Sequence, residues 1–314
     1  MAEKLETVVA LIGGGPACIT ASIQLTRAGL DNLLITDELG GKIKNANLIE
    51  NLLGFPKGIS GDDFIQLLKQ QVRKHSVEYI TQTVKYVEYK NVGTNAFRFI
   101  ITTDKEQVQS KYLIVGTGSK PKKLEIEGEE EAYSKKRLFY ENYNARKHVK
   151  EKNVIIIGGG DIAYDYALNI KDSASNISII QRSSISKSIP ILQTRAQKEE
   201  SIKILTGVNL NKIKFDGKTL VINAKKKDRT LPLIGDIVIV AIGREPNLEI
   251  ISEKLLEAYE GKSENPKIFF VGDVKKNNYR QVSIAMGDGM KAAMEIVKEV
   301  TIEESYHGAS REIW

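Results

Sequence analysis

Two glycine-rich turns are the residues of this chain whose type and spacing could do chemistry. They are Gly13-Gly14-Gly15-Pro16-Ala17-Cys18 and Gly158-Gly159-Gly160-Asp161-Ile162-Ala163, and each follows a short apolar run, Val8–Ile12 and Val154–Ile157. Glycines in such a turn let the backbone approach a pyrophosphate, which then rests on the N-terminus of the next helix. The pattern predicts that one chain binds two dinucleotides.

The elements that must position these turns are buried parallel strands, because both apolar runs are continuous rather than alternating. Each turn is followed by a helix-like stretch and then by a second strand, Leu33–Thr36 after the first turn and Ile177–Ile180 after the second. This repeat of strand, glycine turn, helix and strand predicts an α/β fold with two dinucleotide-binding, Rossmann-like domains.

The residues that follow the second strands differ between the two repeats. Asp37 stands 19 residues after Cys18 with Glu38 beside it, and an acid there can accept a hydrogen bond from a ribose hydroxyl. The second repeat has Gln181-Arg182-Ser183 and no acid at this place. Since a guanidinium flanked by hydroxyls can bind a 2′-phosphate, the second site favours NADP over NAD, and a merely solvated Arg182 is the structural alternative.

Composition excludes several classes of protein. The 314 residues are 41% hydrophobic and 27% charged, with a formal net charge of +6, which is typical of a globular chain of about two domains. No apolar run reaches the ~18 residues of a membrane span, and the first residues lack the apolar core of a secretory signal, so we expect a cytoplasmic protein without membrane contacts. The basic clusters are short and no nucleic-acid motif accompanies them, so we expect no nucleic acid as partner.

The chain has one cysteine, Cys18, and three scattered histidines. No internal disulfide can form, and the histidine spacing predicts no metal site. Cys18 stands where the glycine motif needs a small residue for close packing of helix against strand, so we interpret it as a packing residue.

Further motifs complete the pattern around the two turns. They are Gly40-Gly41-Lys42, Ile49-Glu50-Asn51, Gly116-Thr117-Gly118, Ala241-Ile242-Gly243, Gly272-Asp273-Val274 and Tyr279-Arg280-Gln281-Val282. With them, residues 7 to 300 resemble the flavoprotein pyridine-nucleotide oxidoreductases of the low-molecular-weight thioredoxin reductase type. The resemblance implies a homodimer with FAD and NADP, or NAD, as cofactors.

The resemblance also implies how the chain is divided and which residues hold each cofactor. An FAD-binding domain would comprise residues 1–116 and 245–314, and an NAD(P)H-binding domain, residues 117–244, would be inserted into it. The residues implied for FAD are Gly13, Gly15, Pro16, Ala17, Asp37, Glu38, Gly41, Lys42, Asn51, Thr117, Gly118, Gly272, Asp273, Gln281 and Val282. Those implied for NAD(P) are Gly158, Gly160, Asp161, Ile162, Gln181, Arg182, Ser183, Ile242 and Gly243.

One departure from the family concerns its redox chemistry. Glu141-Asn142-Tyr143-Asn144 stands where the family has Cys-x-x-Cys, so that Glu141 and Asn144 replace the two sulfurs. Dithiol exchange needs a nucleophilic thiolate and a resolving thiol, so we expect no catalytic side chain and no reduction of thioredoxin by the family's mechanism.

Ferredoxin–NADP reductases of the thioredoxin-reductase type also lack the two cysteines. An acidic electron carrier such as ferredoxin would suit the positive net charge. An NAD(P)H oxidase, a quinone or flavin reductase, and a non-catalytic or nicotinamide-independent flavoprotein are the alternatives. In the C-terminal tail, Tyr306 or Trp314 could cover a flavin, as an aromatic ring does in those reductases, and a frayed or packing tail is the structural alternative, which we favour.

Overall fold

The computed structural model describes residues 4–90, 98–227, 229–261, 267–275 and 279–309, and the chain forms two compact units. Unit 1 comprises Met1–Lys44, Leu48–Ser119 and Pro246–Trp314, and unit 2 comprises Asn45–Asn47 and Lys120–Glu245. The division falls three residues later than the predicted boundary at 116/117 and one residue later than that at 244/245. The chain passes from one unit to the other at both places within a two-stranded sheet, β7 (Ser119–Pro121) with β16 (Arg244–Pro246).

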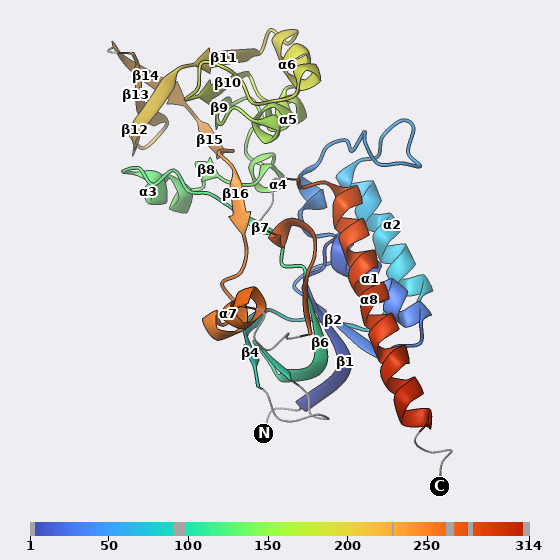
Figure 1. Cartoon of the computed structure of the whole chain (residues 1–314). Coiled ribbons are helices and arrows are strands. Elements are labelled where there is room, and N and C mark those ends of the chain that lie inside the picture. Colours follow the sequence, from blue (N-terminus) through green and yellow to red (C-terminus); the bar gives the residue numbers. More distant parts are fainter. Residues whose placement is uncertain (1–3, 91–97, 228, 262–266, 276–278, 310–314) are drawn as a thin grey trace. The chain divides into compact units, whose positions relative to one another are not determined.

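Unit 1 is built on a sheet of seven strands (Figure 1). Five of them are parallel: β1 (Lys4–Ile12), β2 (Asn32–Thr36), β3 (Tyr79–Thr81), β6 (Gln107–Val115) and β17 (Ile268–Phe270). The remaining two, β4 (Val84–Tyr89) and β5 (Phe99–Thr103), extend the sheet in antiparallel fashion. Ile12 pairs with Ile35 and Val115, so β1, β2 and β6 end at one edge, where the first glycine turn begins.

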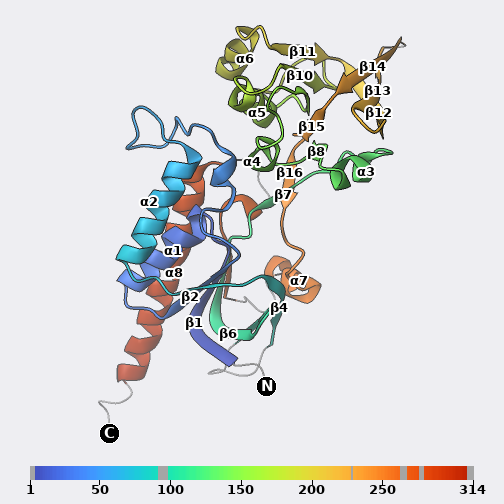
Figure 2. The ribbon, with the colours of Figure 1, turned by 180° about the vertical axis from the view of Figure 1, so that it is seen from behind.

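Helices α1 (Pro16–Arg27), α2 (Gly61–Lys74) and α8 (Val282–Ala309) lie side by side along this sheet in both views (Figures 1 and 2). A Cβ on Gly289 of α8 would overlap the backbone of Ala17 in α1, so the two helices approach closely where small residues face each other. The 3₁₀ turns η1 (Gly41–Asn45) and η2 (Gly272–Val274) and helix α7 (Glu253–Gly261) complete the unit.

Unit 2 contains a second parallel sheet, in the order β11-β10-β9-β15-β8. Its strands are β8 (Leu138–Phe139), β9 (Asn153–Ile157), β10 (Asn176–Gln181), β11 (Ile202–Thr206) and β15 (Ile237–Val240). Helices α5 (Asp161–Ile170) and α6 (Pro190–Gln197) follow β9 and β10, while α3 (Glu129–Ser134) and α4 (Asn142–Ala145) are short. An antiparallel sheet, β12 (Val208–Phe215), β13 (Leu220–Lys226) and β14 (Arg229–Gly235), was not predicted.

The two parallel sheets confirm the predicted α/β class with two Rossmann-type units. Helix α1 begins at Pro16, because proline is well suited to the first helical position. Among the described residues, no helix is long and apolar enough to cross a membrane, and no group of three His, Cys, Asp or Glu residues could hold a metal ion. Trp314 lies outside the described residues, and the side chain of Tyr306 is not described.

Candidate dinucleotide sites

The first glycine turn connects the end of β1 to the start of α1. Gly13 has a φ of +119°, and a Cβ there would overlap the carbonyl group of Gly116. A Cβ on Gly14 would overlap the carbonyl oxygen of Glu38, whereas a Cβ on Gly15 would meet no atom within 4 Å. The fold itself therefore demands the first two glycines, while the third borders open space at the helix N-terminus, where an anion is favoured.

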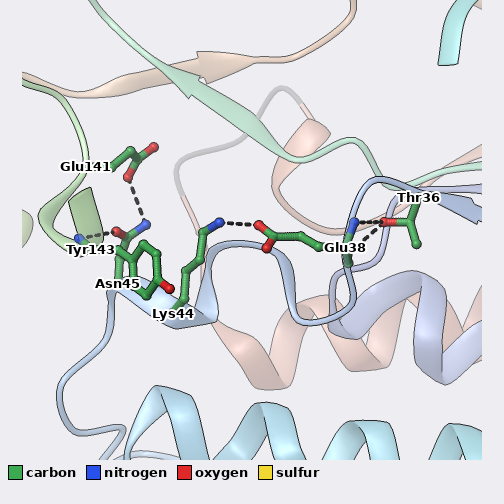
Figure 3. Close-up of polar contacts among 6 residues, drawn as sticks. All are labelled: Thr36, Glu38, Lys44, Asn45, Glu141 and Tyr143. Carbon is green, nitrogen blue, oxygen red and sulfur yellow. Dashed lines mark hydrogen bonds and ion pairs between the residues drawn. The ribbon is translucent and has the colours of Figure 1, made fainter. Parts of the chain in front are cut away.

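The two acids after β2 lie beside this turn and have partners on the chain itself. The carboxylate of Asp37 accepts a hydrogen bond of 2.7 Å from the hydroxyl of Thr83. Glu38 forms an ion pair with Lys44, and its backbone is held at both N–H and carbonyl by the hydroxyl of Thr36 (Figure 3). Since the side chain of Glu38 is 56% exposed, exchanging its ion pair for a ribose hydroxyl would cost only ~1 kcal/mol or less.

The segment after these acids returns to the glycine turn. A Cβ on Gly41 would approach the Cα of Gly15 to 3.2 Å, so η1 starts against the open part of the turn. The ammonium group of Lys42 donates to the hydroxyl of Ser119 over 3.0 Å and lies 3.7 Å from where a Cβ of Gly118 would be. The structure thus brings together Gly41, Lys42 and Gly118, which are far apart in sequence.

The Gly272-Asp273 motif is fixed by a residue that the sequence reading missed. Asp288 of α8 accepts from the backbone N–H of Gly272 over 3.1 Å and from the ammonium group of Lys275 over 2.9 Å. A Cβ on Gly272 would lie 3.2 Å from the Cβ of Ala17, which places Asp273 next to the first turn. Asp288 stands between two glycines, Gly287 and Gly289, and that pattern was the available signal.

Three further residues implied for FAD also lie in unit 1. The amide of Asn51 donates to the side-chain oxygen of Gln281 over 2.9 Å, and Val282 begins α8 next to it. The hydroxyl of Thr117 donates to the carbonyl oxygen of Asn247 over 2.6 Å. These contacts join segments up to 230 positions apart.

The second glycine turn repeats the geometry of the first. A Cβ on Gly158 would overlap the carbonyl group of Ala241, which brings the Ile242-Gly243 segment beside this turn. A Cβ on Gly159 would lie 2.6 Å from Oε1 of Gln181, while a Cβ on Gly160 would meet no atom within 4 Å. Again the first two glycines are required by neighbouring atoms and the third borders open space.

The other residues implied for NAD(P) differ in accessibility. At the start of α5, the carboxylate of Asp161 accepts from the backbone N–H of Ile189 over 2.8 Å, and Ile162 is half-buried. Arg182 and Ser183 are exposed, whereas Gln181 is only 3% exposed. Among the described residues, the Oε1 atom of Gln181 has no hydrogen-bond partner.

Both turns fit a dinucleotide. In each, two glycines hold the backbone close to neighbouring groups and the third leaves space at a helix N-terminus, which is what a pyrophosphate requires. The unpartnered Oε1 atom of Gln181 at the end of β10 is the kind of buried acceptor that a ribose hydroxyl would satisfy.

The position of the missing dithiol is filled by a polar network within unit 2. One oxygen of Glu141 accepts from the guanidinium of Arg244 over 2.8 Å and the other from the amide of Asn45 over 2.8 Å. Asn45 in turn accepts from the backbone N–H of Tyr143 over 3.0 Å (Figure 3). Asn144, at the second sulfur's position, is exposed.

The single thiol cannot substitute for this dithiol. Cys18 is completely buried, its Sγ lies where a Cβ of Gly116 would be, and burial raises the pKa of the thiol to about 12. At neutral pH it is therefore protonated and inaccessible, in agreement with a packing role.

Comparison with known proteins places the chain in a family. Residues 7–289 match the family model described as pyridine nucleotide-disulphide oxidoreductase. Thioredoxin reductase 1 of Saccharomyces cerevisiae is 30% identical over 93% of this chain and 98% of its own length. A "34.2 kDa protein in rubredoxin operon" of Clostridium pasteurianum is 29% identical, covering 96% of this chain and 99% of its own.

A solved structure agrees with these sequence matches. The crystal structure of Lactococcus lactis thioredoxin reductase in its FR conformation superposes with a TM-score of 0.82 at 26% identity, covering 95% of this chain and 99% of that chain. FAD and NADP are the cofactors that this relationship implies. The chain therefore belongs to the pyridine nucleotide-disulphide oxidoreductase family, is similar to thioredoxin reductases, and is an FAD-dependent NAD(P)H oxidoreductase.

Proposed function

We propose that this protein takes a hydride from NAD(P)H through FAD and delivers the electrons to an external acceptor without an internal dithiol, as a ferredoxin–NADP reductase does. The observation that carries the proposal is the replacement of the dithiol. Glu141 stands at one sulfur position and is held by Arg244, while the lone Cys18 is buried and protonated. No residue of the chain can therefore relay electrons as a thiol pair would.

The chain's own residues bind and position the reactants. FAD, when bound, supplies the redox chemistry, since it accepts a hydride and releases electrons singly or in pairs. The first glycine turn would hold the pyrophosphate of FAD at the N-terminus of α1. Asp288 accepts from the backbone N–H of Gly272, which keeps Asp273 beside that turn. The second turn would hold the pyrophosphate of the nicotinamide nucleotide at the N-terminus of α5.

Charge supports a small acidic protein as the electron acceptor. Residues 120–245 carry 24 Lys and Arg against 16 Asp and Glu, a net charge of +8, so the rest of the chain contributes −2 to the total of +6. Basic surface on unit 2 would speed the approach of an acidic carrier such as ferredoxin. The relative described as belonging to a rubredoxin operon is consistent with an electron carrier as partner. A homodimer and a cytoplasmic location remain predictions.

Anaerobic stopped-flow spectroscopy near 450 nm tests the proposal. We expect NADH or NADPH to bleach the flavin of the purified protein, and ferredoxin to reoxidise it faster than a quinone, free flavin, oxygen or oxidised thioredoxin does. The Cys18→Ala variant should be bleached and reoxidised at unchanged rates, because no thiol takes part.

Two outcomes would contradict the proposal. A bound flavin that neither nucleotide bleaches would identify a nicotinamide-independent or non-catalytic flavoprotein. Fast reoxidation by a quinone, free flavin or oxygen, with no response to ferredoxin, would identify a quinone or flavin reductase or an oxidase instead.

A further inference from the structure

A cavity of about 310 Å³ opens in unit 2 between α5, α6 and the ends of β10 and β11. Eight residues line it, of which seven carry a hydroxyl or an amide and none is charged. Gln181 and Ser186 are among these polar residues. The cavity is therefore polar and neutral, unlike the basic surface of the rest of unit 2.

The cavity lies at the nucleotide-binding edge of the sheet. Gln181 is the last residue of β10. This strand pairs with β9, which leads into the second glycine turn, and the Oε1 atom of Gln181 lies 2.6 Å from where a Cβ of Gly159 would be. In Rossmann folds the residue at the end of this second strand meets the adenosine ribose of the bound nucleotide. Gln181 is thus placed to face the ribose.

The chemistry of Gln181 favours a hydroxyl over a phosphate. The residue is 3% exposed, and its Oε1 atom has no hydrogen-bond partner among the described residues. A buried acceptor without a partner is unfavourable, and a ribose 2′-hydroxyl can donate to it. A 2′-phosphate has little to donate at neutral pH, and its charge would have to leave water beside a carbonyl oxygen with no cation lining the cavity.

The cations nearest in sequence do not line this cavity. Arg182 and Lys187 have exposed side chains and are absent from its wall. The loop that carries them folds back over the turn, since the backbone N–H of Lys187 donates to the carbonyl oxygen of Gly159 over 2.8 Å and the hydroxyl of Ser186 donates to it over 3.1 Å. Because the side chain of Arg182 is exposed, any contact that it makes with a phosphate would be screened by solvent.

We propose that this cavity takes an unphosphorylated adenosine ribose, with Gln181 as the residue that determines specificity, so that the protein prefers NADH to NADPH. This inference rests on the proposed function only in that a nicotinamide nucleotide binds unit 2. It reverses the preference predicted from Arg182 and Ser183, and NADPH remains a weaker substrate.

Calorimetric titration of the FAD-loaded, full-length protein with NAD⁺ and with NADP⁺ tests the proposal without relying on turnover. We expect NAD⁺ to bind at least tenfold more tightly. The variant Gln181→Leu should lose about tenfold in affinity for NAD⁺ and little for NADP⁺, because the lost hydrogen bond is made only to the 2′-hydroxyl. Gln181→Glu, which keeps an acceptor, should retain the preference for NAD⁺.

A matched control is Gln71→Leu on the exposed face of α2, which should leave both affinities and the FAD content unchanged. Equal or tighter binding of NADP⁺ by the unaltered protein overturns the proposal, and so does an equal loss of both affinities in Gln181→Leu at unchanged FAD content. The wild-type ratio decides the question even if the Gln181 variants do not fold.

The same titration separates this inference from the proposed function. Tight NAD⁺ binding without flavin bleaching by NADH would support the neutral cavity and refute the hydride transfer. Bleaching by NADPH in clear preference to NADH would support the hydride transfer and refute the neutral cavity. Failure of both nucleotides to bind would refute both.

Discussion

Alanine at the third glycine of each turn should weaken the binding of one dinucleotide about 10- to 100-fold while leaving the fold intact. The backbone at Gly15 has φ −79° and ψ 174°, and that at Gly160 has φ −102° and ψ −179°, which are extended conformations that alanine adopts readily. A Cβ at either position meets no protein atom within 4 Å. The new methyl group would instead occupy space that a pyrophosphate needs.

The magnitudes separate the effect on the fold from the effect on binding. Both residues are helix N-caps, where alanine is worse than glycine by up to about 1 kcal/mol, whereas a glycine-to-alanine change gains about 0.4–1 kcal/mol by restricting the unfolded chain. Stability should therefore change by less than about 1 kcal/mol. Loss of the close approach to the pyrophosphate should weaken binding by about 10- to 100-fold, or ~1.4–2.8 kcal/mol.

The assay measures FAD content, nucleotide affinity and the urea midpoint for each variant. Gly15→Ala should lose FAD, and Gly160→Ala should keep FAD and lose affinity for NAD(P)H. Gly14→Ala and Gly158→Ala serve as contrasts, because their Cβ atoms would overlap the backbone of Glu38 and Ala241 and should destabilise the fold itself. Unchanged nucleotide affinity in a folded Gly160→Ala protein would refute the assignment of the second turn.

Three further changes probe the surroundings of the sites. Asp288→Ala should raise the Kd of the apoprotein for FAD about tenfold, and Asp288→Asn less, because only alanine leaves the N–H of Gly272 without an acceptor; fluorescence titration measures both. Glu141→Ala removes the carboxylate that pairs with the guanidinium of Arg244, whose side chain is 9% exposed. In urea unfolding, this change should lower the free energy of unfolding by about 3 kcal/mol. The control Glu200→Ala, at an exposed residue, should lower it by under about 0.5 kcal/mol. Burial raises the pKa of Cys18 from 9.0 to about 12, so above pH 9 only the unfolded chain loses the thiol proton and stability falls as pH rises towards 12. At pH 10 the loss amounts to about 1.4 kcal/mol, and urea midpoints at pH 8 and 10 should show it in the wild type but not in Cys18→Ala.

The glycine turns could be predicted from sequence because their requirements are local. A turn from a strand into a helix needs glycine where backbone atoms crowd, and Gly13 and Gly158 each abut a carbonyl of the neighbouring strand's end. The strands that flank them are continuous apolar runs, which are also local signals. The α/β class and both glycine turns with their flanking strands could therefore be predicted from the sequence.

Contacts between distant segments could not be predicted in the same way. Asp288 accepts a hydrogen bond from Gly272, and Lys42 donates one to Ser119 across 77 positions. The glycines on either side of Asp288 mark that residue, but no pattern along the chain identifies the partner in either pair. The boundaries of the two units lie one to three residues from the predicted domain boundaries, and the segments that pass from one unit to the other pair with each other as β7 and β16. The strands β12 to β14 were missed although β13 alternates buried and accessible residues, a signal that was present in its sequence.

The two glycine turns share a geometry, so their ligands must be distinguished by residues outside the glycine motif. Around the first turn stand charged groups, Glu38 paired with Lys44 and Asp288 paired with Lys275. Beside the second turn, the cavity at Gln181 holds only neutral groups. An arginine that follows a strand in sequence indicates a phosphate site only if its side chain faces the ligand. Here Arg182 is exposed, and the buried side chain is that of Gln181, the residue before it. On our proposal, nucleotide choice is decided by which side chain the fold buries and which it leaves in solvent.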